Sequence, residues 1–185
     1  LLKDVVDYFF ITEADHTHLG EKKEFEAVAA LDELEIRHDQ VQVFHVEVPN
    51  TESMEPWVRE RAQRDALSVP LNMMPPDTIF ISGNDNEIPN PAIIPKLKEA
   101  VEKEYVKVKR LSMAMLHDKA DTQVCDRGGK PFTWEASVVD TVKGLKEYGT
   151  LSEIRGAEDN YTIGDLDGGW MFNCATDKSV IYSKY

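Results

Sequence analysis

The sequence is poor in cysteine, with only Cys125 and Cys174 among its 185 residues. Their spacing matches no metal-ligand motif, and a single bridge between them would not make a secreted disulfide scaffold. This scarcity favours a reduced compartment. The chain also has no apolar run near the roughly 18 residues that a membrane-spanning helix needs, and no signal peptide opens it. We therefore expect no membrane segment.

Positive charge is scarce as well. The chain carries 21 Lys and Arg residues against 34 Asp and Glu residues, which gives a net charge of -13. A surface this acidic repels the phosphates of nucleic acids and of anionic lipids. We therefore expect no nucleic-acid partner, and membrane surfaces are poor candidates. A neutral glycan remains compatible with this charge. So does a phosphorylated ligand whose charge is met locally by a metal ion or by a few arginines.

What the chain does contain is an alternation of β-rich and helical segments. This pattern predicts one α/β domain over residues 1–185, with a mostly parallel sheet and helices on both faces. The expected strands are Val5–Glu13, Val41–Val48, Thr78–Ser82 and Val106–Met115. The expected helices are Glu24–Leu34, one from Pro56 with an apolar stripe through Val58, Ala62, Ala66 and Val69, one from Pro95 with Leu97 and Val101 inward, and Ser137–Tyr148.

Polar side chains stand at the ends of two predicted strands. Thr12 and Glu13 end the first strand, and the stretch Asn84 to Glu87 follows the strand Thr78–Ser82. Ligands of open α/β sheets bind beyond the carboxyl ends of the strands. Closely spaced oxygen ligands there can hold a divalent cation that neutralises a diphosphate. Asn and Asp also favour turns for purely local reasons, so both interpretations stay open.

Four segments carry a resemblance to a known family. They are Val5–Gly20, a strand followed by Glu-Ala and a loop closed by glycine; Trp57–Leu67, a helix with Trp, Glu and a Gln-Arg pair; Ile79–Pro89, which ends in Glu-Ile-Pro; and Gly169–Cys174, which begins with Gly-Trp. In this order they resemble glycosyltransferase family 17, the β-1,4-N-acetylglucosaminyltransferases. The resemblance implies a GT-A-like, Rossmann-like fold. We expect this chain to lack the family's first strand, which precedes the segment from Val5, either as a truncated member or as a short variant whose donor pocket is built differently.

The family resemblance also implies a reaction: inverting transfer of N-acetylglucosamine from UDP-N-acetylglucosamine to a hydroxyl of a glycan or glycoprotein. Such a transfer needs a general base and positive charge at the departing diphosphate. The candidate donor-binding residues are Glu13, Gln63, Arg64, Asn84, Asp85 and Asn86. The candidate bases are Glu87, Asp165 and Asp167, and the candidate acceptor-binding residues are Trp134 and Trp170.

Each of these roles has a structural alternative. Arg64 is the preferred cation, but it could instead form an ordinary surface pair with Glu60, four residues earlier. Glu87 could be a structural residue that accepts backbone hydrogen bonds within the Glu-Ile-Pro turn. Trp170 could belong to the core, since tryptophan is highly buried on average, and Trp134 could anchor a loop.

The chain departs from the family at residues that would bind a metal ion. Asn84 and Asn86 replace the two acids of the family's Asp-x-Asp motif, and Met171 replaces the histidine after Gly-Trp. An amide oxygen coordinates a hard cation without supplying charge. We therefore expect Mn²⁺ or Mg²⁺ binding to be weak, shifted onto Asp85 and Glu87, or absent.

Two other functions compete with an active glycosyltransferase. A catalytically weak or inactive homologue that binds a sugar nucleotide or glycan would explain the departures. A metal-dependent hydrolase could use Asp15, His16 and His18, although it would need a complete ligand set with an open position. Family members that act on glycoproteins carry a Golgi membrane anchor, whereas a bacterial or viral member could be cytoplasmic, so the location stays open.

Overall fold

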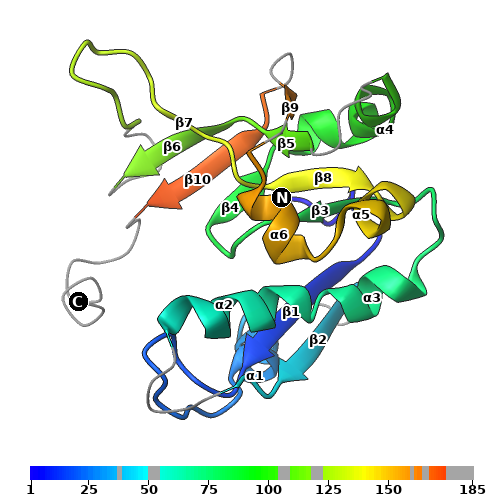
Figure 1. Cartoon of the computed structure of the whole chain (residues 1–185), viewed down its shortest axis with the longest axis vertical. Coiled ribbons are helices and arrows are strands. Elements are labelled where there is room, and N and C mark those ends of the chain that lie inside the picture. Colours follow the sequence, from blue (N-terminus) through cyan, green and yellow to red (C-terminus); the bar gives the residue numbers. More distant parts are fainter. Residues whose placement is uncertain are drawn as a thin grey trace.

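The computed structural model describes residues 1–36, 39–49, 55–103, 109–117, 123–158, 161–163 and 167–173. Within them the chain is a mixed α/β protein whose sheets combine parallel and antiparallel strands (Figure 1). The α/β class predicted from the sequence is confirmed. The mixed strand directions do not confirm the mostly parallel sheet.

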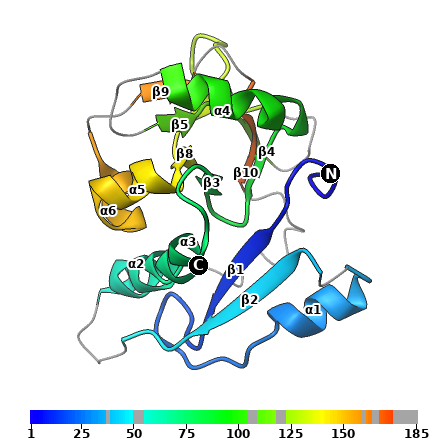
Figure 2. The ribbon, with the colours of Figure 1, turned by 90° about the vertical axis from the view of Figure 1, so that its right-hand side faces the viewer.

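The N-terminal part forms a small parallel sheet. Strand β1 (Phe9–Ala14) pairs with β2 (Val41–Val46), and α1 (Ala27–Glu33) connects them. Helix α2 (Pro56–Asp65) begins with proline in its first turn, where a missing N–H costs nothing. It packs between β1 and α6 (Leu151–Gly156), as Figures 1 and 2 show.

Two further sheets complete the fold. The first has the order β3 (Ile79–Ser82), β8 (Val138–Thr141), β5 (Lys109–Leu111) and β9 (Tyr161–Ile163). The second has the order β4 (Glu87–Pro89), β10 (Gly169–Asn173), β6 (Met113–His117) and β7 (Thr133–Trp134). The remaining elements are α3 (Ser68–Met73), η1 (Pro91–Ile93), α4 (Ile94–Lys103) and α5 (Val142–Tyr148). Only Ser112 separates β5 from β6, so one run of chain serves both sheets.

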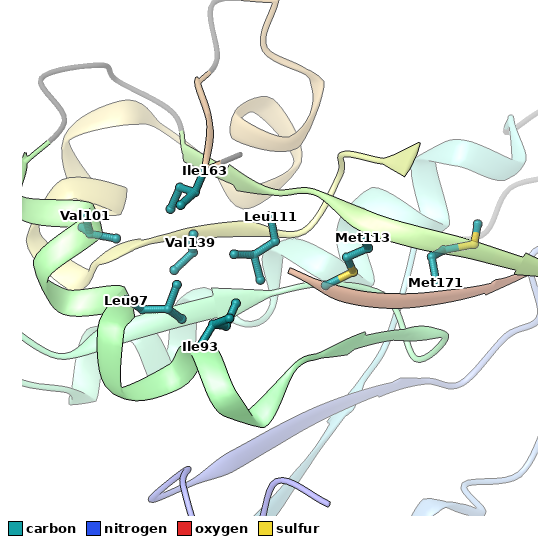
Figure 3. Close-up of a cluster of buried hydrophobic side chains, with 8 residues drawn as sticks. All are labelled: Ile93, Leu97, Val101, Leu111, Met113, Val139, Ile163 and Met171. Atoms are coloured by element: carbon teal, nitrogen blue, oxygen red, sulfur yellow. The ribbon is translucent and has the colours of Figure 1, made fainter. Parts of the chain in front are cut away.

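Buried apolar side chains form two clusters. One lies around β3, β8, α5 and α6 and contains Leu71, Phe80, Val138, Val142, Leu145, Leu151 and Ile154. The other, shown in Figure 3, contains Ile93, Leu97, Val101, Leu111, Met113, Val139, Ile163 and Met171. Leu97 and Val101 are buried as the sequence predicted. Neighbouring Val138 and Val139 serve different clusters because successive side chains of a strand point to opposite faces.

A contact between two aromatic rings joins the sheet of β1 and β2 to the sheet that contains β3. Phe10 of β1 stacks on Phe80 of β3, with ring centroids 6.3 Å apart and planes 9° from parallel. The two strands belong to different sheets and are not hydrogen-bonded neighbours. Side-chain packing therefore connects β1 to β3.

Four sequence-based boundaries need correction. The described part of Val106–Met115, predicted as one strand, contains β5 and the first residues of β6, which belong to different sheets. The segment predicted as one helix from Ser137 to Tyr148 begins as strand β8 and becomes helical only at Val142. The first strand starts at Phe9 instead of Val5. The helix from Pro56 ends at Asp65, and Val69 is half exposed on the separate helix α3.

Candidate functional site

Helix α2 brings the ends of β1 and β3 together. The Gln63 side chain donates from Nε2 to the backbone oxygen of Thr12 at 2.6 Å. The next residue, Arg64, donates from Nη2 to Oδ1 of Asn84, just beyond β3, at 3.3 Å. Three of the predicted donor-binding residues, Gln63, Arg64 and Asn84, therefore lie close together near the carboxyl ends of β1 and β3.

Arg64 also forms the ion pair that sequence reasoning offered as its alternative role. Its Nη2 bonds to Oε1 of Glu60, four residues earlier on α2. The Arg64 side chain is only 12% exposed, so this is not a freely solvated surface pair. Arg64 is thus fixed between a carboxylate on its own helix and an amide on the turn after β3.

The turn after β3 is fixed by its own bonds and by β10. The Glu87 N–H donates to the backbone oxygen of Asn84 at 3.0 Å. Asn86 accepts from the Phe172 N–H at 2.9 Å and donates from Nδ2 to the Phe172 oxygen at 3.1 Å. Asp85 is exposed between them, and its carboxylate makes no hydrogen bond or ion pair with the described residues.

Glu87 is the centre of a buried polar cluster, which we call the Glu87 cluster: Glu87, Trp134, Ser137 and Arg155. Its Oε1 accepts from Trp134 Nε1 at 3.0 Å and from Arg155 Nη2 at 2.5 Å. Its Oε2 accepts from Ser137 Oγ at 2.5 Å and from Arg155 Nη1 at 3.1 Å. The Glu87 side chain has no exposed surface.

These bonds determine the protonation state of Glu87. Burial alone would raise the pKa of the carboxyl group, but the hydrogen bonds from Arg155 and Ser137, the Arg155 charge and the Trp134 hydrogen bond lower it below 4.5. A carboxylate offers about four lone-pair sites, and here four donors use them. Glu87 is therefore ionised at neutral pH, and no lone pair is left for a metal ion or a substrate proton.

The described residues offer few ligands for the Mn²⁺ or Mg²⁺ ion whose binding we expect to be weak, shifted or absent. Within the described ranges, no group of three or more His, Cys, Asp and Glu residues could hold a metal ion. At the turn itself, Glu87 is fully hydrogen-bonded and the amide oxygen of Asn84 accepts from Arg64. Asp85 alone offers a carboxylate, whereas a hard cation usually takes several oxygen ligands. Met171 is buried in the second apolar cluster.

Glu13 caps a helix. Its carboxylate accepts from Lys23 Nζ at 2.7 Å and from the N–H groups of Glu26 and Ala27 at 2.8 and 3.0 Å. Burial opposes ionisation, yet these bonds and the Lys23 charge lower the pKa of Glu13 below its ordinary value. A carboxylate at the start of α1 also interacts favourably with the helix dipole.

The predicted acceptor-binding residues and the two remaining predicted bases lie outside α2 and the turn after β3. Trp134 is half-buried and its indole N–H is bound to Glu87, whereas Trp170 is half-buried in β10 opposite Ile88 and Ala114. Asp167 is exposed, and its Oδ2 accepts from Asn90 Nδ2 at 3.3 Å. The third predicted base, Asp165, lies outside the described residues, as does Cys174.

The Asp15–His18 loop is an arrangement of local contacts. His16 Nδ1 lies 2.9 Å from Asp15 Oδ1, and Asp15 also accepts from the Val48 N–H at 3.0 Å. The close approach of His16 and then the hydrogen bond from Val48 lower the pKa of Asp15. His18 packs edge-on against Trp57, with ring centroids 5.0 Å apart.

Sequence reasoning missed Ser137 and Arg155. Arg155 lies on α6, which no family segment covers. The signal that could have located this helix is the capping box at its start, where Thr150 and Glu153 bond reciprocally. Nothing local links Arg155 to Glu87, which is 68 residues earlier in the chain.

Comparison of the chain with protein-family models, with curated proteins and with solved structures finds no match. The described helices include none long and apolar enough to cross a membrane.

Proposed function

We propose that this chain binds a sugar nucleotide and acts as a glycosyltransferase of the GT-A type, with the diphosphate of the donor at Arg64 and Asn84. One observation carries the proposal: the four segments behind the family resemblance meet at one place. Gln63 binds Thr12, Arg64 binds Asn84, and Asn86 binds Phe172. These three contacts join Val5–Gly20, Trp57–Leu67, Ile79–Pro89 and Gly169–Cys174.

The proposed donor site works without a metal ion. The Arg64 guanidinium presents several N–H donors in a plane, which suits the oxygens of a diphosphate and the charge that develops as it leaves. The amide groups of Gln63 and Asn84 add neutral polar contacts. The exposed Asp85 carboxylate would accept hydrogen bonds from hydroxyls of the donor's ribose or sugar. The family's metal-binding acids are thus replaced by a cation and amides.

Asp167 is the base that we assign to an inverting transfer. A base must accept a proton from the acceptor hydroxyl as that hydroxyl attacks the anomeric carbon. Asp167 is exposed and accepts one hydrogen bond, from Asn90, whereas Glu87 already accepts four. Trp170, three residues after Asp167, would offer a ring face to the glycan acceptor.

A binding protein without transferase activity is the second candidate. It is favoured by the amides that Asn84 and Asn86 carry in place of the family's acids and by the occupied carboxylate of Glu87. Such a protein would keep the Arg64 contact with the diphosphate but transfer no sugar.

Isothermal titration calorimetry with UDP-N-acetylglucosamine, with and without Mn²⁺, tests the proposed donor site. We expect binding that does not depend on Mn²⁺ and that weakens about tenfold or more in Arg64→Gln, since a charge-assisted hydrogen bond is lost. Arg61→Gln, an exposed arginine of the same helix, is the matched control and should bind normally. Absence of binding in both conditions would contradict the proposal.

Sugar transfer separates the two candidates. With a panel of glycan acceptors, the transferase should release UDP, and Asp167→Asn should abolish release while leaving the donor dissociation constant unchanged. Binding of the donor without any transfer by the unaltered chain would favour the binding protein.

A further inference from the structure

The Glu87 cluster connects the turn after β3 to distant parts of the fold. Glu87 begins β4 immediately after Asn86, and its carboxylate is held by α6 through Arg155, by β7 through Trp134, and by Ser137 before β8. Arg155 Nη1 also donates to the backbone oxygen of Ala136 at 2.9 Å. The guanidinium is thus itself fixed in place.

Gly83 allows the turn to approach this cluster. A Cβ atom at Gly83 would lie 2.8 Å from Ser137 Oγ and 2.9 Å from Glu87 Oε2, closer than real contacts allow. The backbone on one side of Asn84–Asn86 therefore packs directly on the cluster, and Glu87 joins the other side. Both ends of the turn depend on the same buried carboxylate.

A buried ion pair contributes little net stability, because removing two charges from water costs about as much as their attraction returns. Its geometry is nevertheless demanding, since Arg155 binds both oxygens of Glu87 in a bidentate pair. A bidentate pair of this kind is suited to holding the Glu87 side chain, and the backbone next to it, in one position.

We propose that Arg155 is a positioning residue that acts through Glu87 to hold the turn Asn84–Asn86 in the conformation that binds the donor. The inference rests on the proposed function for its ligand, but the effect on the turn exists without any ligand. Arg155 itself does not touch the sugar nucleotide.

The test compares Arg155→Lys and Glu87→Gln with Asp140→Asn. Lysine keeps the charge at 155 but cannot bind both carboxylate oxygens in the same planar geometry. Asp140→Asn is the matched control, because Asp140 forms another buried ion pair, with Lys109 on β5. Trp134→Phe, which removes one neutral donor from Glu87, is a milder variant should the first two unfold.

Backbone hydrogen exchange in the free protein is the first measurement. We expect the amides of Glu87 and Phe172, which donate to the Asn84 and Asn86 oxygens of the turn, to exchange about tenfold faster in Arg155→Lys, Glu87→Gln and Trp134→Phe. Those of β2 and β9 should change by less than about twofold. In Asp140→Asn the exchange of the turn amides should not increase more than that of β2 and β9. Equal acceleration along the whole chain in all variants would overturn the proposal, because it would show only a loss of global stability.

The dissociation constant for UDP-N-acetylglucosamine is the second measurement, made where each variant is fully folded. It should rise about tenfold in Arg155→Lys and stay unchanged in Asp140→Asn. A faster-exchanging turn with unchanged affinity would overturn the link to binding. If the unaltered chain binds no sugar nucleotide, the proposed function fails, while the exchange data still decide whether Arg155 holds the turn.

Discussion

Two buried ion pairs of this protein each join a basic side chain to a carboxylate, but they lie at different places in the fold. Lys109 Nζ donates to Asp140 Oδ2 at 2.8 Å, and both side chains are 5% exposed. This pair links β5 and β8, which are already neighbours in one sheet. The Arg155–Glu87 pair links α6 to β4, the first strand of a different sheet.

The two ion pairs position different parts of the fold. Asp140 also accepts from the Thr141 N–H at 2.6 Å, at the residue that caps α5. A Cβ on Gly144 would lie 2.7 Å from its carboxyl group, so α5 packs closely on Asp140. The Lys109–Asp140 pair therefore supports the junction of β8 and α5, whereas the Arg155–Glu87 pair determines how the turn after β3 sits relative to α6.

Breaking the Lys109–Asp140 pair should have the largest effect on stability. Lys109→Met leaves the Asp140 carboxylate buried without its cation and should lower the free energy of unfolding by about 3–5 kcal/mol. Urea denaturation measures this loss. The double variant Lys109→Met/Asp140→Leu removes the unpaired charge and should regain most of it. A double variant no more stable than the single one would show that packing, and not the stranded charge, causes the loss.

Removing one donor from Glu87 should have a smaller effect. Ser137→Ala leaves Arg155 and Trp134 in place and should cost about 1.5–3 kcal/mol, the usual contribution of a hydrogen bond to a charged group. Ser152→Ala is the control, since its hydroxyl donates to the Arg61 backbone oxygen near the surface. If both variants lose the same stability, the buried carboxylate does not depend on Ser137.

Acid should weaken the Glu87 cluster. Because the folded-state pKa of Glu87 is lowered, its stabilising contribution is full above the unfolded-state value of 4.5 and is lost as pH falls through the folded-state pKa. Thermal unfolding between pH 6 and about pH 2.5 should show this decline. Glu87→Gln should have a shallower decline, with a residual slope from Glu13, whose pKa is also lowered. An unchanged slope would contradict the assignment.

The smallest effect on stability should come from Glu13, which belongs to neither of the two buried ion pairs. Glu13→Gln weakens the cap of α1 and should cost about 0.3–1 kcal/mol. Faster hydrogen exchange in the first turn of α1 would report it. Glu33→Gln, at the unfavourable end of the same helix dipole, is the control and should be neutral or slightly stabilising. Destabilisation by both variants would argue against a capping role.

Sequence patterns were sufficient where the determining residues are close together in the chain. Pro56 in the first turn located the start of α2, and the spacing of Leu97 and Val101 identified the buried side of α4. Arg64 was selected because it lies with Gln63 on the polar side of its helix, and the two side chains reach β1 and the turn after β3.

Patterns failed where distant residues determine the structure. Val138 and Val139 fit a helical segment locally, but pairing with β3 and β5 on both sides makes them a buried strand. The three partners of Glu87 lie 47, 50 and 68 residues away. No local spacing distinguishes a base with free oxygens from a carboxylate saturated by such partners.

The pairing of β1 with β2 has a consequence for how copies of this protein could associate. Among the described strands, β1 is hydrogen-bonded only to β2. On its other edge the Thr12 oxygen accepts from Gln63, and the rest of that row of N–H and C=O groups has no strand partner among the described residues. An apolar strand with an unpaired edge is a template for another extended chain. The net charge of -13 keeps neighbouring copies apart over a distance that added salt shortens. Self-association at β1 should therefore increase with ionic strength.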